Sequence, residues 1–294
     1  MIRFMNLKKY LETRKSIVDK HLHTLMPLKS VRPKLIHEAT RYGLFNGGKR
    51  IRPILTCASC EAVSGKYKQA LDYACGIELI HTYSLIHDDL PCMDNDDFRR
   101  GKPTTHKVYG DAIAVLTGDA LLTRAFQIFA RNPKIGGAQL IEKIAHAAGS
   151  HGLIGGQVID LESEGKRVTA KTLEYIHRHK TGSLISVAIE AGALIGKASR
   201  KQLFALKTFG DNIGLTFQIS DDILDITGTK EKLGKGIGKD IAQKKATYPA
   251  LYGMEKTKRL LVNKTQEALD ALSTFDKKAD PLREIARFIA QRDR

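Results

Sequence analysis

Two clusters of aspartate residues carry the side chains best suited to chemistry. The first lies within Asp88-Asp89-Leu90-Pro91-Cys92-Met93-Asp94, and the second is Asp221-Asp222-Ile223-Leu224-Asp225. Both come at the end of an apolar stretch, where unpaired buried carboxylates would be costly, so these groups must be solvated, paired or bound to cations. Carboxylate oxygens are the hard ligands that Mg²⁺ prefers, and the chain is rich in Lys and Arg. The pattern suggests Mg²⁺ holding a polyphosphate.

The spacing within each cluster predicts how its carboxylates are presented. Residues i and i+4 share a helix face, so Asp221 and Asp225 should point the same way. Asp88 and Asp94 are six residues apart, and Pro91 between them should disturb the helix and let Asp94 return toward Asp88. We therefore expect the two aspartate arrays to face each other across a cavity.

Basic residues occur beside these clusters or at glycine- and proline-containing segments, where we expect turns or helix starts. The segments concerned are Gly48-Lys49-Arg50-Ile51-Arg52-Pro53, Arg99-Arg100-Gly101, Lys180-Thr181-Gly182, and the stretch 227–245, which contains Lys235 and Lys239. We expect Lys180 to begin a helix, whose free N–H groups favour anions. Arginine suits bidentate contacts to phosphate. The cations are therefore candidates for holding the polyphosphate.

Composition sets the class of protein. The 294 residues are 42% hydrophobic and 27% charged, which predicts a single globular domain spanning residues 1–294. There is no apolar run of about 18 residues, so we expect no stable membrane insertion. Four cysteines and no secretory signal favour the cytoplasm. The net charge of +16 fits phosphorylated ligands, whereas few aromatic residues and no Trp argue against nucleic acid.

Hydrophobic periodicity predicts an all-α chain. Apolar residues recur at helical spacing over residues 70–87, 112–130, 135–153, 184–195 and 200–226, and the tail 256–294 reads as one or two amphipathic helices. Thr169 is the expected N-cap of a further helix. The Gly/Lys stretch 227–245 is the one long candidate loop, and loops of this length are often functional.

The motifs together resemble the trans-isoprenyl diphosphate synthases, also called polyprenyl synthetases, and most of all the bacterial farnesyl diphosphate synthases. Besides the segments above, the matching stretches are Ile80-His81-Thr82-Tyr83-Ser84-Leu85-Ile86-His87, Thr117-Gly118-Asp119, Gly156-Gln157, His179-Lys180-Thr181-Gly182, Phe217-Gln218-Ile219-Ser220 and Gly238-Lys239-Asp240. They follow the family's order over residues 48–249.

The resemblance implies an isoprenoid-synthase-type helical bundle around a deep central cavity, usually as a homodimer. It also implies a reaction. An allylic diphosphate (dimethylallyl or geranyl) loses pyrophosphate with the help of Mg²⁺, the double bond of isopentenyl diphosphate attacks the resulting cation, and a proton leaves. A dry, apolar cavity would protect that cation from water.

The family pattern also implies roles for individual residues. Asp88 and Asp94 would bind two Mg²⁺ ions and Asp221 a third, supported by Asp89, Asp222 and Asp225. The allylic diphosphate would be held by Arg99, Lys180, Gln218 and Lys235, with Thr181 near the developing cation. Isopentenyl diphosphate would be held by Gly48, Lys49, Arg52, His81 and Arg100.

Product length is also implied by the resemblance. Tyr83 lies five residues before Asp88, roughly 7.5 Å back along the helix, and in the family an aromatic residue here forms a floor for the growing chain. Ser84 stands next to it. Together with the extra pair Pro91-Cys92, Tyr83 favours a C15 product. Geranylgeranyl diphosphate synthases, which make a C20 product, share nearly all of these motifs and are the near alternative.

Two other classes of protein remain open at this point. His81, His87 and Asp88 could belong to a helical His-Asp metal phosphohydrolase, which would use transition metals. That interpretation leaves Gln218 and the second aspartate cluster without roles. A non-catalytic subunit or a nucleic-acid binder would not require two intact aspartate clusters.

Overall fold

The computed structural model describes residues 5–131, 135–227 and 246–291, and these residues form a helical bundle with one short hairpin. The first half contains α1 (Leu7–Leu25), α2 (Lys34–Phe45), α3 (Ile51–Ser64), η1 (Lys68–Ala70), α4 (Leu71–Asp88), β1 (Phe98–Arg99), β2 (Lys102–Pro103), α5 (Thr105–Tyr109) and α6 (Asp111–Arg131). The second half contains α7 (Gly137–Ala148), α8 (Leu153–Ser163), α9 (Ala170–Ile176), η2 (His177–Gly182), α10 (Ser183–Ile195), α11 (Arg200–Thr227), α14 (Tyr248–Tyr252), α15 (Met254–Ala271), η3 (Lys277–Ala279) and α16 (Asp280–Gln291).

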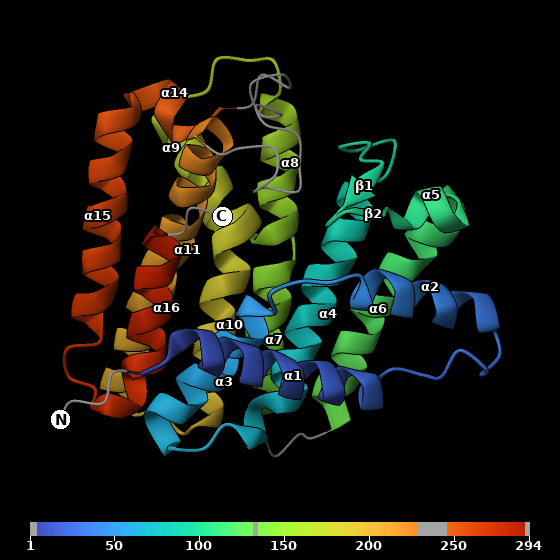
Figure 1. Cartoon of the computed structure of the whole chain (residues 1–294), viewed down its shortest axis with the longest axis horizontal. Helices are drawn as coiled ribbons and strands as arrows, with labels where there is room; N and C mark the ends of the chain where they lie inside the picture. The colour runs from blue at the N-terminus through green and yellow to red at the C-terminus, as the bar shows by residue number, and fades with distance from the viewer. Residues whose placement is uncertain (1–4, 132–134, 228–245, 292–294) are drawn as a thin grey trace.

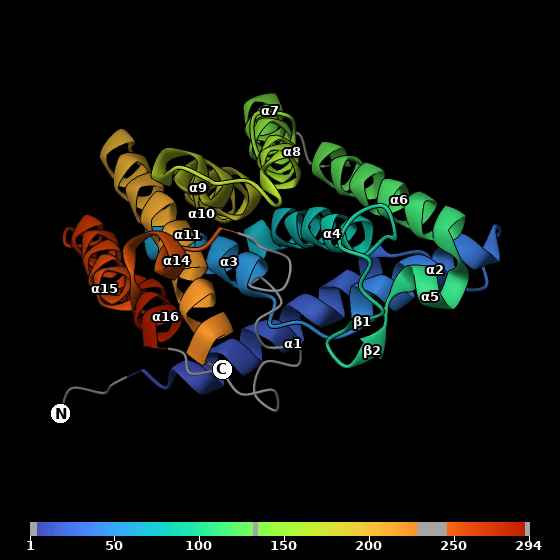
Figure 2. The ribbon, with the colours of Figure 1, turned by 90° about the horizontal axis from the view of Figure 1, so that it is seen from above.

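The long helices stand side by side, and α1 and α2 lie across them (Figure 1). Seen from above, α4 and α6 form one side of the bundle, while α11, α15 and α16 form the other (Figure 2). Two clusters of buried apolar side chains form most of the core of the bundle. One contains Tyr73 and Phe129, whose rings stack 5.0 Å apart, and the other contains Phe209. A fully buried side chain of this size stabilises the fold by roughly 1.5–3 kcal/mol.

The predicted all-α class is confirmed, and most predicted helices match α4, α6, α10 and α11 within two residues. One predicted helix, over residues 135–153, was too long: α7 ends at Ala148, and residues 149–152 form a turn before α8 begins at Leu153. A Cβ atom at Gly152 would lie 2.1 Å from the carbonyl oxygen of Ala147, so the turn requires glycine. Thr169 caps α9 as predicted, its Oγ1 accepting the Thr172 N–H.

Helix α6 is, among the described residues, the one helix long and apolar enough to cross a membrane by length and composition. It nevertheless packs into the bundle, where Leu121 and Ala125 are fully buried. Asp119 and Arg124 also interrupt its apolar sequence. Helix α6 therefore packs one face into the bundle, and the absence of membrane insertion stays a prediction.

Candidate active site

The loop before α3 is shaped around the guanidinium of Arg100. Gly47 and Gly48 have φ of 94° and 118°, a region that disfavours any residue with a side chain. Arg100 donates from Nη1 to the Gly47 carbonyl oxygen at 2.7 Å, and a Cβ atom at Gly48 would lie 2.6 Å from the same nitrogen. The two glycines therefore allow the backbone to approach Arg100, which the family resemblance assigns to isopentenyl diphosphate.

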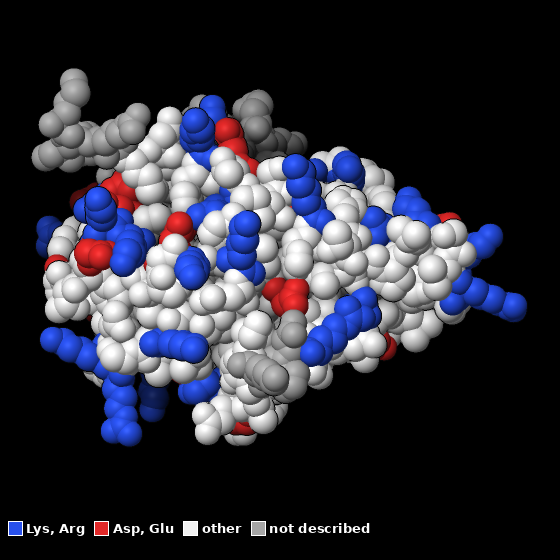
Figure 3. All heavy atoms as spheres, turned by 90° about the horizontal axis from the view of Figure 1, so that it is seen from below, with Lys and Arg blue, Asp and Glu red and all other residues white. Residues whose placement is uncertain are grey.

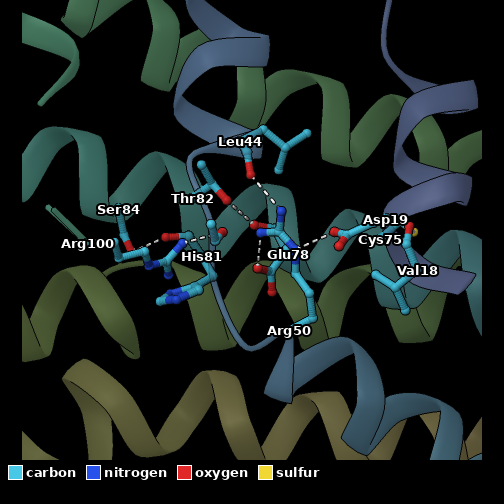
Figure 4. Close-up of polar contacts among 11 residues, drawn as sticks. Val18, Asp19, Leu44, Arg50, Cys75, Glu78, His81, Thr82, Ser84 and Arg100 are labelled. Carbon is cyan, nitrogen blue, oxygen red and sulfur yellow. Dashed lines mark hydrogen bonds and ion pairs between the residues drawn. The ribbon is translucent and has the colours of Figure 1, made fainter. Parts of the chain in front are cut away.

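Arg50 anchors this loop from inside the protein (Figure 4). It is 3% exposed and donates to Asp19 Oδ1 at 2.8 Å, Glu78 Oε1 at 2.8 Å and the Leu44 carbonyl oxygen at 2.7 Å. Burial lowers the pKa of Arg50, but the carboxylates of Glu78 and Asp19 outweigh it and the net shift is upward. Arg50 is thus a positioning residue that fixes Lys49 and Arg52 on either side of it.

Arg52, His81 and Arg100 form one electrostatic cluster. Burial is the main cause that lowers the pKa of Arg52 to about 10, and nearby Arg100 lowers it further, whereas Glu78 and Asp221 oppose the shift. Burial also holds the pKa of His81 well below its usual range, reinforced by Arg52 and Arg100. At neutral pH the arginines are charged and the imidazole is neutral, so the cluster favours an anion.

The first aspartate cluster folds back as its proline predicts. Helix α4 ends at Asp88, and the Asp94 N–H donates to the Asp88 carbonyl oxygen at 2.9 Å. A second backbone bond runs from the Asp96 N–H to the Asp89 carbonyl oxygen at 3.2 Å. The turn therefore brings the backbone of Asp94 beside that of Asp88.

Asp89 differs from Asp88 and Asp94 in being buried, and it packs against Arg99. It is 3% exposed, and its Oδ1 lies 2.6 Å from Arg99 Nη2 and 2.7 Å from Nε. Burial lowers the pKa of Arg99, but Asp89 outweighs this and raises it overall. This pairing orients Arg99. The expected role of Asp89 beside a metal stays a prediction.

The second aspartate cluster lies on α11, where Asp222 is held from two directions. Asp222 is 4% exposed and accepts the backbone N–H of Tyr248, the first residue of α14, at 2.8 Å. His177 Nε2 approaches its Oδ2 to 3.3 Å without forming a hydrogen bond. Asp222 thereby joins α11 to α14. Asp221 and Asp225 keep the shared face that their spacing predicts.

His177 is the main residue of this region that the sequence did not single out. It is 7% exposed, stacks on the Tyr248 ring with centroids 5.2 Å apart, and places Nδ1 3.3 Å from Gln218 Nε2. His177 thus touches both Gln218 and Asp222. Its only sequence signal is that it precedes His179-Lys180, which is too weak to assign a role.

Lys180 and Thr181 do not begin a helix, so the expectation of free N–H groups there was wrong. Residues His177–Gly182 form a π-helical turn that joins α9 to α10 without a break. Helix α8 approaches so closely that a Cβ atom at Gly156 would lie 2.1 Å from the Lys180 backbone nitrogen. Lys180 Nζ pairs with Asp160 on α8 at 2.7 Å. An anion that binds at this turn would therefore meet the ammonium group of Lys180, and not the free N–H groups of a helix terminus.

Tyr83 and Ser84 lie in the middle of α4. Tyr83 is 5% exposed, and burial raises the pKa of its hydroxyl to about 12. Among the residues that the structure describes, none forms a hydrogen bond with this hydroxyl. Its ring meets the edge of His87, whose Nε2 lies 3.0 Å from the Val115 carbonyl oxygen on α6. Ser84 Oγ donates to the His81 carbonyl oxygen at 2.9 Å.

One hollow adjoins the arginines. It is small and partly open to solvent, and it is lined by Asn46, Thr82, Asp89, Arg99, Arg100 and Thr104 among others. It lies between α2, α4 and the hairpin. The deep central cavity stays a prediction. Lys235, Lys239 and Asp240 lie outside the described residues.

The donor atoms suit Mg²⁺ better than a transition metal. Within the described ranges, no three His, Cys, Asp or Glu side chains converge as a ready-made metal site. Mg²⁺ needs no such cage, because it is usually bound through one or two carboxylates, several waters and substrate phosphates. The six aspartates supply carboxylate oxygens alone, whereas His87 is engaged with α6. The residues fit Mg²⁺ bound together with a diphosphate.

Comparison with known proteins gives one consistent family. The polyprenyl synthetase family model matches residues 33–285. The chain is 50% identical to a geranylgeranyl diphosphate synthase of Cyanophora paradoxa, over 98% of this chain and 97% of that protein. It is 48% identical to a farnesyl diphosphate synthase of Geobacillus stearothermophilus, over 89% of this chain and 90% of that protein. An apo FPP/GFPP synthase from Zymomonas mobilis superposes with a TM-score of 0.86 at 39% identity, covering 97% and 99% of the two chains.

The helical bundle, the carboxylate clusters and the arginine-rich loop define a helical prenyltransferase. The chain belongs to the polyprenyl synthetase family and is a trans-prenyl synthase. Enzymes of this family generally use Mg²⁺ and prenyl diphosphates. The alternatives of a phosphohydrolase and a nucleic-acid binder fall away.

Proposed function

We propose that this enzyme condenses isopentenyl diphosphate with dimethylallyl and geranyl diphosphate in the cytoplasm, and that farnesyl diphosphate (C15) is its main product. The observation that carries the proposal is the buried ring of Tyr83, five residues before Asp88 on α4. A chain growing from Asp88 along α4 would meet this ring after about 7.5 Å. The unpartnered hydroxyl costs about 1–3 kcal/mol, so stability alone does not explain a tyrosine here.

The charges of the site match the charges of the reaction. Bound Mg²⁺, which we expect at three positions, would neutralise the pyrophosphate as it leaves the allylic carbon. Arg99 and Lys180, each oriented by a carboxylate, would hold the same leaving group from opposite sides. This is electrostatic stabilisation of the charge that develops in the transition state.

The second substrate would bind at the Arg52, Arg100 and His81 cluster. The two arginines can neutralise the charge of the diphosphate of isopentenyl diphosphate, which is bound here and is not cleaved. The neutral imidazole of His81 can donate one hydrogen bond to a phosphate oxygen. The absence of a Cβ atom at Gly48 leaves room for the guanidinium of Arg100, which lies against the backbone at the surface of the loop.

A C20 product is the second candidate, because the family resemblance does not separate the two. The 50% identical relative from Cyanophora paradoxa is a geranylgeranyl diphosphate synthase, and a chloroplastic relative from Capsicum annuum with that name is 46% identical. The two candidates differ by one condensation. They therefore predict the same site and different product lengths.

Product sizing tests the proposal. The purified enzyme receives Mg²⁺, labelled isopentenyl diphosphate and geranyl diphosphate, and the products are dephosphorylated and separated by chain length. We expect mainly C15 from the wild type and longer products from Tyr83→Ala. Tyr83→Phe is the matched control, because it keeps the ring and removes only the hydroxyl, so its product should stay C15.

Two results would contradict the chain-length proposal. A C20 product from the wild type would assign the enzyme to the second candidate. An unchanged C15 product from Tyr83→Ala would remove Tyr83 as the floor.

The active unit is proposed to be a homodimer that pairs through α6. Val115 and Leu116 on this helix are 40% and 53% exposed, and Val108 on the preceding α5 is 46% exposed. Grouped apolar side chains at the surface of a soluble protein commonly mark an interface. Light scattering should give a dimer for the wild type and a monomer for Leu116→Lys. A monomeric wild type would contradict the dimer.

A further inference from the structure

The connection between α1 and α2 is an exposed tip in which apolar and basic side chains alternate. We call residues 27–35 the α1–α2 tip. Leu28, Val31 and Leu35 are 63%, 47% and 47% exposed, so three large apolar side chains face solvent within eight residues. The cations between them are also exposed: Lys29, Arg32 and Lys34. Neither the site nor the core uses these side chains.

The tip has one sign of charge. No acidic residue occurs between Asp19 and Glu38, whereas Lys20 joins the three cations of the tip. Lys and Arg side chains project from the tapered end of the molecule in Figure 3, the end at which Figure 1 shows the α1–α2 connection. The tip therefore presents a positive field around an apolar centre.

Hydrogen bonds from α2 and α6 fix the chain where the tip begins. Arg41 on α2 donates from Nη1 to the carbonyl oxygens of Met26 and Pro27, at 3.3 Å each. Arg124 on α6 donates from Nε to the carbonyl oxygen of Leu25 at 3.1 Å. The bond to Leu25 satisfies the last carbonyl of α1, which would otherwise lack a partner, and the bonds to Met26 and Pro27 satisfy the two carbonyls that follow the helix. Within the tip, the Val31 N–H donates to the Leu28 carbonyl oxygen at 3.1 Å.

From these features we propose that the α1–α2 tip docks the enzyme on a bilayer with anionic headgroups. The three cations would lie at the level of the phosphates, and Leu28, Val31 and Leu35 would enter the boundary with the acyl chains. Charge complementarity favours this partner. A second copy would bring the same basic tip against itself, and the tip has no aromatic ring on which a nucleobase could stack. The proposal does not depend on product length.

The first test uses the absence of tryptophan from the chain. Leu28→Trp introduces a single fluorophore at the tip, and Val262→Trp on α15 is the matched control, because the two side chains are 63% and 65% exposed. We expect the emission of the tip variant to shift to shorter wavelength on vesicles of phosphatidylcholine with phosphatidylglycerol, and the control to stay unchanged. No shift at the tip, or equal shifts in both variants, would overturn the proposal.

The second test separates the tip from the overall charge. Vesicle cosedimentation compares the wild type with a variant in which Lys29, Arg32 and Lys34 are serine, and with a control in which Lys166, Arg167 and Lys171 are serine. The control cations are exposed but are flanked by Glu162, Glu164 and Glu174. We expect on the order of 100-fold weaker binding for the tip variant and only a few-fold change for the control.

Changing Leu28, Val31 and Leu35 to serine should weaken vesicle binding roughly tenfold or more without changing net charge. If the tip variant and the control variant lost vesicle affinity equally, the overall positive charge of the protein would explain binding, and the proposal would be overturned. A change of mass in light scattering on altering the tip would assign it to a second copy instead. Thermal unfolding of each variant confirms that it is folded.

Discussion

The two sides of the site are held by different forces. On the α4 side, Arg50 and Arg99 keep their positions through ion pairs with the buried carboxylates of Glu78 and Asp89. On the α11 side, Asp222 accepts a backbone N–H and touches His177, which stacks on Tyr248. The first arrangement depends on paired charges, and the second depends on capping and stacking.

This difference predicts how each side responds to change. Removing one member of a buried ion pair leaves the other charged and desolvated, so the α4 side should fail as a unit. A backbone N–H needs only an acceptor, so the α11 side should tolerate a neutral residue of the same shape. The following variants test this contrast.

The largest effect is expected for Arg50→Met. Glu78 is 2% exposed and would lose the partner that lies 2.8 Å away, so the free energy of unfolding should fall by about 3–5 kcal/mol. Urea unfolding measures this. The double variant with Glu78→Met should recover much of the loss, because the buried unpaired charge is gone, while Asp19, which also loses Arg50, is 30% exposed to solvent. A loss below about 1 kcal/mol for Arg50→Met would show that Glu78 is not held by this pair.

A smaller, pH-dependent effect is expected from His81. Its pKa is depressed in the folded protein, so below the unfolded value of about 6.5 the unfolded chain binds a proton that the folded chain does not. Stability should therefore fall as the pH drops below about 6.5, by at most about 1.4 kcal/mol per pH unit from this group. His81→Gln should remove that part of the slope in urea unfolding between pH 7.5 and 5. Identical slopes in both proteins would contradict the depressed pKa.

The smallest effect is expected on the α11 side. Asp222→Ala removes the acceptor of the Tyr248 N–H and should cost about 1 kcal/mol or somewhat more of unfolding free energy. Asp222→Asn keeps an acceptor oxygen and should stay within about 0.5 kcal/mol of the wild type. If the Asn variant were as unstable as the Ala variant, the charge of Asp222 would matter and the contrast between the two sides would weaken.

The sequence predicted what depends on local pattern. The apolar period located α4, α6, α10 and α11, and Pro91 predicted the return of the chain after Asp88. The turn between α7 and α8 was missed although Gly149 and Gly152 mark it, because it is only four residues long and has apolar residues directly before and after it.

The sequence could not predict what depends on distant partners. The π-helical turn at Lys180 exists where α8 and α11 approach at Gly156 and Gly214, which no local signal reveals. The bond from the Tyr248 N–H to Asp222 likewise joins residues 26 apart. Such pairings are set by the packed bundle, so the motifs identified the site residues but not the partners that orient them.

The two aspartate clusters are proposed to hold one diphosphate between them through Mg²⁺. Calorimetry with a geranyl diphosphate analogue that does not ionise tests it most directly, on the wild type, Asp88→Asn, Asp221→Asn and the double variant. We expect Mg²⁺-dependent binding and a coupling energy of about 1 kcal/mol or more between the two changes. Additive losses within about 0.5 kcal/mol, or equal binding with and without Mg²⁺, would contradict it.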